Sequence, residues 1–170
     1  MRKLASLLSI IDSISEWTGK MAGFLVIFTV LVMVYEVVAR YGFKAPSIWG
    51  FELTIFLCGT AMIIGGAYTL RYAGHVNVDI LHSRFSLRGR AILDLVTATL
   101  FFLFVGMLAW KGWEFAWGSA KHFEHTDSLW SPPIYPFKMM LPIAAWMLAL
   151  QGLAKFIRDL TTAVTGREAK

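Results

Sequence analysis

The sequence predicts an all-α integral membrane protein, a single membrane domain over residues 1–170 with four transmembrane helices and both termini in the cytoplasm. The chain is 57% hydrophobic and only 16% charged, whereas a soluble domain has about 25% charged residues. Four apolar stretches, at about residues 21–39, 51–70, 91–110 and 137–157, are each about 20 residues long. A helix of about that length crosses the roughly 30 Å hydrocarbon core of a bilayer.

An amphipathic helix at the membrane surface is predicted for residues 3–16, ahead of the first span. Its apolar residues recur at helical spacing, at Leu4, Leu7, Leu8, Ile11 and Ile14. Polar residues interrupt this stretch too often for the apolar core of a cleavable signal peptide. The alternative is that these residues are simply the first turns of the first span.

The first two spans are predicted to form an antiparallel hairpin around a periplasmic loop at residues 40–50. Gly42 and Pro46 interrupt the helix there. Glu36 precedes Arg40 by one turn, so the two side chains can pair, either at a packed interface or as a plain ion pair at the headgroup level. Glu52 lies in the first turn of the second span, where the helix dipole favours a carboxylate, and Arg40 across the hairpin is a possible partner.

Small residues in the second span indicate close contact with another helix. Ala61 and Gly65 are four residues apart, and Gly59 and Gly66 lie nearby. Such a pattern lets two helix backbones approach closely, although glycine is also simply frequent in membrane helices.

Two connections follow, a polar one at residues 71–90 that we place in the cytoplasm and a periplasmic one at residues 111–136. Trp110, Trp113 and Trp117 recur at helical spacing, which is typical of an aromatic belt, with cofactor stacking as the alternative. The second connection also holds two histidines and two acids, in the string HFEHTD. Metal binding there is an alternative to simple solvation, but no second ligand cluster accompanies the string.

The distribution of basic residues predicts the orientation. Eleven lysines and arginines fall on the side that carries both termini, and five fall on the other. The positive-inside rule then places both termini in the cytoplasm. Since the basic residues flank the spans, they give no reason to expect nucleic-acid binding.

The chain lacks the residue patterns of an enzyme, and we expect no catalytic residue, cofactor or bound metal. No nucleophile and base are paired, and no glycine-rich phosphate loop is present. One cysteine excludes disulfide chemistry within the chain, and all four histidines lie in connections. No span has a charge near its centre, where a self-contained transporter needs one.

Four strings occur in order along the chain: YEVVARYGF at residues 35–43, Trp49 with Glu52, GGAYTLRYAGHVNVD at residues 65–79, and SLWSPPIYPFKMMLPIAAWMLALQG at residues 128–152. In residue type and spacing they resemble the DctQ-like small membrane subunit of tripartite ATP-independent periplasmic (TRAP) transporters. The similarity covers roughly residues 19–159, which is nearly the whole chain. The positions that match the family's recurring polar residues are Glu36, Arg40, Glu52, Arg71, His75 and Asp79.

The resemblance implies a subunit of a sodium-coupled uptake system for an organic acid in a bacterial inner membrane. Its partners are then a large, DctM-like membrane subunit, which carries substrate and sodium, and a periplasmic substrate-binding protein. The small subunit is implied to be a scaffold for the large one. The matching polar positions are then expected to fix the hairpin and the cytoplasmic turn, or to contact the large subunit.

Two other classes compete with this interpretation. A stand-alone four-helix exporter would use Glu36 as its proton-coupled acid, although Glu36 lies near a helix end rather than at mid-span. A membrane anchor of a redox complex would copurify with a cofactor or with soluble subunits.

Overall fold

Four long helices make up the computed structural model, which describes residues 2–72 and 87–165. They are α1 (Arg2–Val37), α2 (Gly50–Arg71), α4 (Leu87–Lys121) and α5 (Tyr135–Thr165), and a short π-helix, η1 (Val38–Gly42), continues α1. Each long helix contains a segment long and apolar enough to cross a membrane. The predicted all-α, four-span fold class is therefore confirmed.

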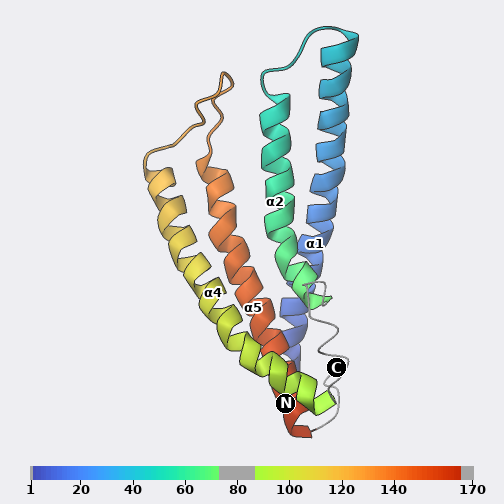
Figure 1. The fold of residues 1–170 in the computed structure, drawn as a ribbon, viewed down its shortest axis with the longest axis vertical. Coiled ribbons are helices and arrows are strands. Elements are labelled where there is room, and N and C mark those ends of the chain that lie inside the picture. Colours follow the sequence, from blue (N-terminus) through green and yellow to red (C-terminus); the bar gives the residue numbers. More distant parts are fainter. Residues whose placement is uncertain (1, 73–86, 166–170) are drawn as a thin grey trace.

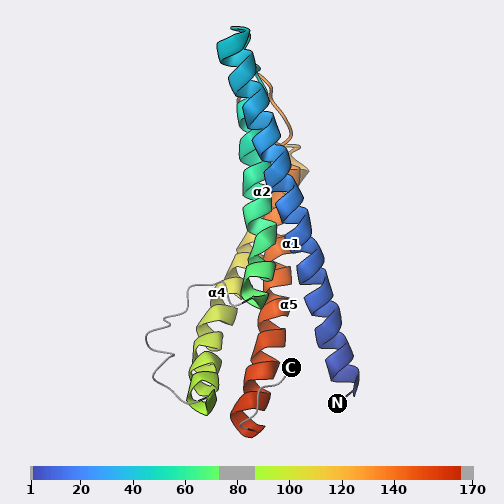
Figure 2. The same ribbon diagram turned by 90° about the vertical axis from the view of Figure 1, so that its right-hand side faces the viewer.

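The first helix is a single element, without the separate surface helix predicted at residues 3–16. Figure 2 shows α1 as one uninterrupted ribbon from its N-terminal turns to the hairpin tip. Residues 3–16 are therefore its first turns, which corrects the prediction of two helices in favour of the alternative. No proline lies between residues 2 and 37, and the polar residues Asp12 and Ser15 bind other helices, so nothing requires a break before the span.

Helix α4, the third of the four long helices, is longer than the predicted third span. It continues to Lys121, so the first eleven residues of the connection predicted at 111–136 are helical. An ion pair between Lys111 and Glu114 at 2.8 Å, one turn apart, lies on this extension. No proline occurs between residues 47 and 131, and the helix therefore has no strong sequence signal to end at residue 110.

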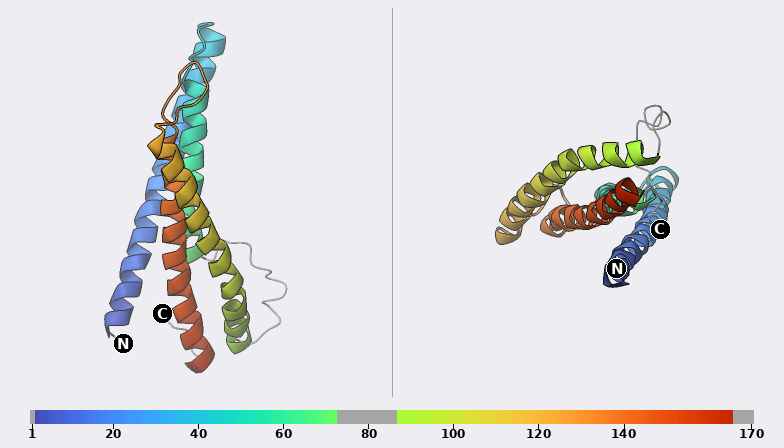
Figure 3. Two further views of the ribbon diagram at one scale, coloured as in Figure 1. Left: turned by 90° about the vertical axis from the view of Figure 1, so that its left-hand side faces the viewer. Right: turned by 90° about the horizontal axis from the view of Figure 1, so that it is seen from below.

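The helices form two antiparallel hairpins, α1 with α2 and α4 with α5. The hairpins meet where α2 packs on α5, and α1 also touches α5. In Figure 1 the outer helices α1 and α4 lie apart near the loops, and in Figure 2 they lie apart toward the end that carries the N-terminus, so the two hairpins cross at an angle. Seen from below in Figure 3, α5 lies between α4 and α1.

Small side chains fill the contacts between these helices. Among the described residues, nine of the eleven buried hydrophobic side chains are alanines, and the other two are Val32 and Val105. Most large apolar side chains instead point outward. Such packing is typical of membrane helices, whose close approach depends on small residues rather than on a bulky core.

Candidate functional site

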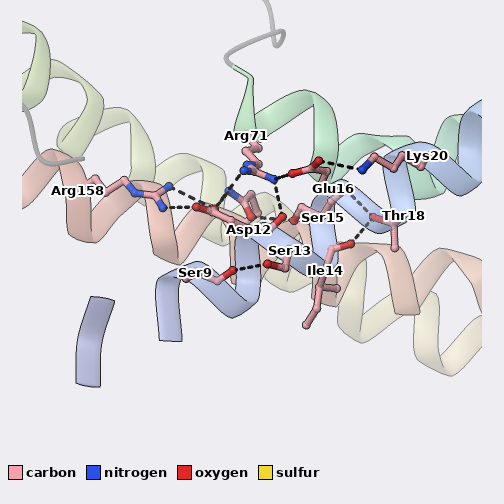
Figure 4. Close-up of polar contacts among 11 residues, drawn as sticks. Ser9, Asp12, Ser13, Ile14, Ser15, Glu16, Thr18, Lys20, Arg71 and Arg158 are labelled. Atoms are coloured by element: carbon pink, nitrogen blue, oxygen red, sulfur yellow. Dashed lines mark hydrogen bonds and ion pairs between the residues drawn. The ribbon is translucent and has the colours of Figure 1, made fainter. Parts of the chain in front are cut away.

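A cluster of polar side chains joins three helices near the end of the bundle that carries the N-terminus. We call it the terminal cluster, and it contains Asp12, Ser15 and Glu16 of α1, Arg71 of α2, and Gln151 and Arg158 of α5 (Figure 4). It was not predicted as a site, and only Arg71 was among the predicted polar positions.

Asp12 lies at the centre of the terminal cluster. Its Oδ2 accepts a 2.5 Å bond from Nη2 of Arg158, and its Oδ1 accepts a 3.1 Å bond from Nε2 of Gln151. The Oε1 of Gln151 in turn accepts a 2.8 Å bond from the Ser15 hydroxyl. Ser15 and Gln151 are 2% and 1% exposed, so their bond satisfies polar groups that water does not reach. Losing one partner would leave the other buried without a bond, at about 1–3 kcal/mol.

Arg71 extends the terminal cluster to the end of α2. Its Nη1 donates to the backbone carbonyl of Asp12 at 2.7 Å and to Oε2 of Glu16 at 2.9 Å. Glu16 also pairs with Lys20 at 3.0 Å on α1 itself. Arg71 was among the positions predicted to fix the hairpin and the cytoplasmic turn or to contact the large subunit, and its observed partners lie on α1.

A second ion-pair group joins α4 to α5 near the same end of the bundle. The Nζ of Lys155 lies 3.0 Å from Oδ2 of Asp94 and 3.0 Å from Oδ2 of Asp159. Since Asp94 belongs to α4 and the other two residues to α5, this group holds the second hairpin together as the terminal cluster holds the first hairpin to α5.

At the opposite end, the predicted pair of Glu36 and Arg40 is confirmed. Arg40 Nη2 donates to Glu36 Oε1 at 2.7 Å. The other carboxylate oxygen accepts bonds from the hydroxyl and the backbone amide of Ser47. Glu36 is only 8% exposed, so this carboxylate is packed against the hairpin loop, as in the packed-interface alternative.

Glu52 bonds to the second loop. Its Oε2 accepts a 2.6 Å hydrogen bond from the hydroxyl of Ser128. The Ser128 oxygen also accepts a 3.0 Å bond from the amide of Ser131. The partner considered from sequence, Arg40, is bound to Glu36, and the bond to Ser128 links the tips of the two hairpins.

The loop between α4 and α5 is tied to the start of α5 by an ion pair. Lys138 Nζ lies 2.6 Å from Oε2 of Glu124, and this hydrogen bond lowers the pKa of the Glu124 carboxyl. The loop backbone closes through bonds from Thr126 N to the Pro132 carbonyl and from Ile134 N to the Glu124 carbonyl. Within residues 2–72 and 87–165, no three potential metal ligands come together.

The predicted tryptophan stripe lines a groove along α4 and α5. Trp113 and Trp117 stack with ring centroids 6.0 Å apart. Together with Trp110 and with Trp146 of α5 they border a volume of about 1030 Å³. All four rings are at least 48% exposed, as expected for aromatic side chains that face the membrane boundary.

The small residues predicted for helix packing divide into two groups. A Cβ at Gly59 would lie 2.9 Å from the Phe137 ring of α5, one at Gly65 would lie 3.9 Å from Ala22 of α1, and Ala61 is buried. A Cβ at Gly66 would meet nothing within 4 Å. The predicted polar positions His75 and Asp79 lie outside the described residues.

The residues that sequence reasoning missed are mainly Asp12, Ser15, Gln151 and Arg158. For Asp12, Gln151 and Arg158 the sequence signal was an ionisable or amide side chain close to the end of an apolar segment, where an unpaired polar group is costly. Ser15 had no comparable signal. That signal marks each residue as needing a partner, but it does not say which helix supplies the partner.

Comparison with protein families gives one match that covers most of the chain. The family model for the DctQ component of the tripartite ATP-independent periplasmic transporters matches residues 29–162. The search of curated proteins returns no significant match. The matched region begins near the end of α1 and runs through almost all of α5. It includes α2, α4 and the Glu36–Arg40 pair, whereas Asp12, Ser15 and Glu16 of the terminal cluster precede it. The chain therefore belongs to the DctQ family, the DctQ component of TRAP transporters, in agreement with its four candidate membrane helices and with the sequence strings.

Proposed function

We propose that this chain is the scaffold subunit of a sodium-coupled TRAP transporter in a bacterial inner membrane. It holds the fixed part of a large, DctM-like membrane subunit while that subunit carries an organic acid delivered by a periplasmic binding protein. Both termini face the cytoplasm, and the two hairpin tips face the periplasm. The substrate and the sodium ions bind to the other chains.

The placement of the polar groups is the observation that carries this proposal. Ion pairs gather near the two ends of the helices, at Asp12–Arg158 and Lys155–Asp94 on one side and at Glu36–Arg40 on the other. Between the ends, residues 21–35, 53–70, 95–110 and 139–154 contain no charged side chain. A cation or a carboxylate crossing the membrane needs polar partners near the midplane, whereas a scaffold needs only fixed ends and apolar faces.

In this proposal the predicted polar positions stabilise the subunit or contact its large partner. Glu36 holds the Ser47 turn, Glu52 holds the second loop, and Arg71 binds α1. Arg40 contacts Glu36 but leaves 49% of its side chain exposed, so it is available to a neighbour. The pairing of Glu36 also argues against a stand-alone exporter, since its carboxylate is held by Arg40 and Ser47.

Copurification and reconstitution test the proposal. Affinity purification of this chain from native membranes in mild detergent should recover a stoichiometric multi-span subunit, identified by mass spectrometry. Proteoliposomes that contain the large subunit and the binding protein should take up substrate under a sodium gradient only when this chain is present. Recovery of the chain alone, or full uptake without it, would overturn the scaffold role.

Arg40→Glu gives a sharper version of the test. The substitution places two acids together at the hairpin tip, and we expect less of the large subunit to copurify. Lys44→Glu, with the same charge change in the same exposed turn, is the matched control and should leave recovery unchanged. Equal recovery and uptake for both variants would show that Arg40 plays no part in assembly.

A further inference from the structure

A groove with one apolar end and one charged end runs along α4 and α5. It encloses the volume of about 1030 Å³ described above, and we call it the tryptophan groove. Val105 and Ala109, which are 1% and 5% exposed, form its floor, and the exposed tryptophan rings of α4 stand along one side. Ligand pockets in proteins enclose about 300–1,000 Å³. The tryptophan groove is therefore large enough to hold a small molecule.

The end of the tryptophan groove nearer the start of α4 is apolar. It is lined by Gly106 and Ala109 of α4 and by Trp146 and Ala149 of α5. These α5 residues lie level with Gly106, because Gly152, a short way further along α5, packs on Phe101 of α4. A Cβ at Gly106 would meet nothing within 4 Å, so this position opens into the groove. Residues 95–110 and 139–154 contain no charged side chain, and this end therefore suits a hydrocarbon chain.

The end of the tryptophan groove nearer the α4–α5 loop carries its charged side chains. Lys111 and Glu114 neutralise each other in an ion pair at 2.8 Å. Lys121 continues the line of stacked rings, since its Nζ lies 6.0 Å from the centroid of the Trp117 ring, which stacks on Trp113. Within residues 2–72 and 87–165, no ion pair includes Lys121. This end therefore offers one cation that no described acid neutralises.

The length of the tryptophan groove matches one leaflet of a bilayer. From Val105 to Lys121, α4 rises about 24 Å. A bilayer with its headgroups is about 40–45 Å thick, so one lipid molecule spans about 20–22 Å. A transmembrane helix would instead need an apolar face of about 30 Å, whereas charges line the last part of this groove. Length and charge together fit an amphiphile with its tail beside Gly106 and its negative head at Lys121.

We propose that the tryptophan groove binds one anionic phospholipid. An acyl chain lies on the floor between the α4 tryptophan rings and Trp146, and the phosphate group pairs with Lys121. A headgroup with net negative charge is favoured over a zwitterionic one, because the cation of a zwitterionic headgroup is repelled by Lys121. The site is built from this chain alone, so it does not depend on the proposed scaffold role. A helix of another subunit and unselective bilayer lipid are the competing occupants.

Retention of added lipid tests the site. The full-length chain is purified in mild detergent and delipidated, and dioleoyl phosphatidylglycerol or dioleoyl phosphatidylcholine is added before native mass spectrometry. We expect one phosphatidylglycerol to stay bound under activation that removes phosphatidylcholine. Lys121→Gln should lower the fraction of chains that carry phosphatidylglycerol several-fold. Lys44→Gln makes the same charge change in an exposed turn of the other hairpin, and as the matched control it should leave that fraction unchanged.

Filling the apolar end gives a second readout. Gly106→Leu places a side chain in the open space of the tryptophan groove and should lower phosphatidylglycerol retention several-fold. Gly23→Leu is the matched control, because a Cβ at Gly23 also meets nothing within 4 Å and Gly23 lies outside the groove on α1. Equal retention by these two variants would overturn the inference. Equal retention of the two lipids by the unmodified chain would do so as well.

A photoreactive lipid locates the tail. Proteoliposomes that contain the full chain, with any subunit that copurifies with it, receive phosphatidylglycerol with a diazirine at the end of one acyl chain. After irradiation, mass spectrometry should place the adducts at residues 105–109 and 146–149. Adducts spread evenly over the four long helices would mean unselective bilayer lipid. Adducts that form on the chain alone but disappear when another subunit is present would assign the tryptophan groove to that subunit. Either result would contradict the proposed lipid site.

Discussion

Asp12 of α1 and Arg158 of α5 pair at 2.5 Å although 146 residues separate them in the chain. The pair joins the first helix to the last near the end of the bundle that carries the N-terminus. Gln151 and Arg71 bind the same stretch of α1, so α2 and α5 are both held to it. The terminal cluster is therefore one of the contacts that hold the first hairpin to the second.

Breaking this pair should destabilise the subunit. We expect Arg158→Ala to lower the free energy of unfolding by about 1–3 kcal/mol, because it leaves the partly buried Asp12 carboxylate without its charged donor. Thermal unfolding of the purified chain in mild detergent measures the effect. Lys111→Ala, which breaks an exposed ion pair with Glu114, is the control and should change stability by less than about 1 kcal/mol. The double variant Asp12→Ala with Arg158→Ala should lose less than the sum of the single variants.

The buried hydrogen bond between Ser15 and Gln151 should contribute more to stability than a hydrogen bond on an exposed helix face. Ser15→Ala leaves Oε1 of Gln151 buried without a donor, and we expect a loss of about 1–3 kcal/mol. Ser13→Ala removes a hydroxyl that only bonds the carbonyl of Ser9 on an exposed face, so it serves as the matched control. Equal unfolding temperatures for the two variants would show that the buried bond contributes nothing to stability.

The crossing of α1 and α2 depends on the absence of a side chain at position 19. A Cβ on Gly19 would overlap the Tyr68 ring and lie 2.9 Å from the Tyr68 Cβ. We therefore expect Gly19→Ala to force the helices apart and to cost about 1–3 kcal/mol. Gly23→Ala, one turn further along α1, meets nothing within 4 Å and should be neutral or stabilising by up to about 1 kcal/mol. Thermal unfolding of both variants in mild detergent measures the difference. Equal unfolding temperatures would show that the contact of Gly19 with Tyr68 does not limit the approach of α1 and α2.

The ion pair of Glu124 and Lys138 should make the stability of the loop depend on pH. The hydrogen bond from Lys138 lowers the pKa of the folded Glu124 carboxyl, so folding is favoured while this carboxyl is ionised. The contribution is fully present above the ordinary pKa of glutamate and disappears as the pH falls through the lowered value. Glu124→Gln should therefore unfold at a lower temperature than the unmodified chain at about pH 7, and the difference should shrink toward about pH 3. A difference that did not change with pH would mean that the charge of Glu124 is not the stabilising feature.

The sequence by itself determined the features that depend on local chemistry. Four apolar segments of membrane length predict four spans, because backbone groups in lipid must be bonded within a helix. The pair of Glu36 and Arg40 was predictable because residues four apart share a helix face. The length of α4 was underestimated, since a loss of apolarity after Trp110 marks the membrane boundary but does not end a helix.

Only the tertiary structure decided which polar residues meet. Asp12, Gln151 and Arg158 each needed a partner, yet their separation along the chain does not reveal which helices are neighbours or how they are rotated. Glu52 illustrates the same point, because its bond to Ser128 depends on how the two hairpins lean together. The physical reason is that helix formation in a membrane is a local process, whereas the pairing of helices is settled by close packing and by a few long-range polar contacts.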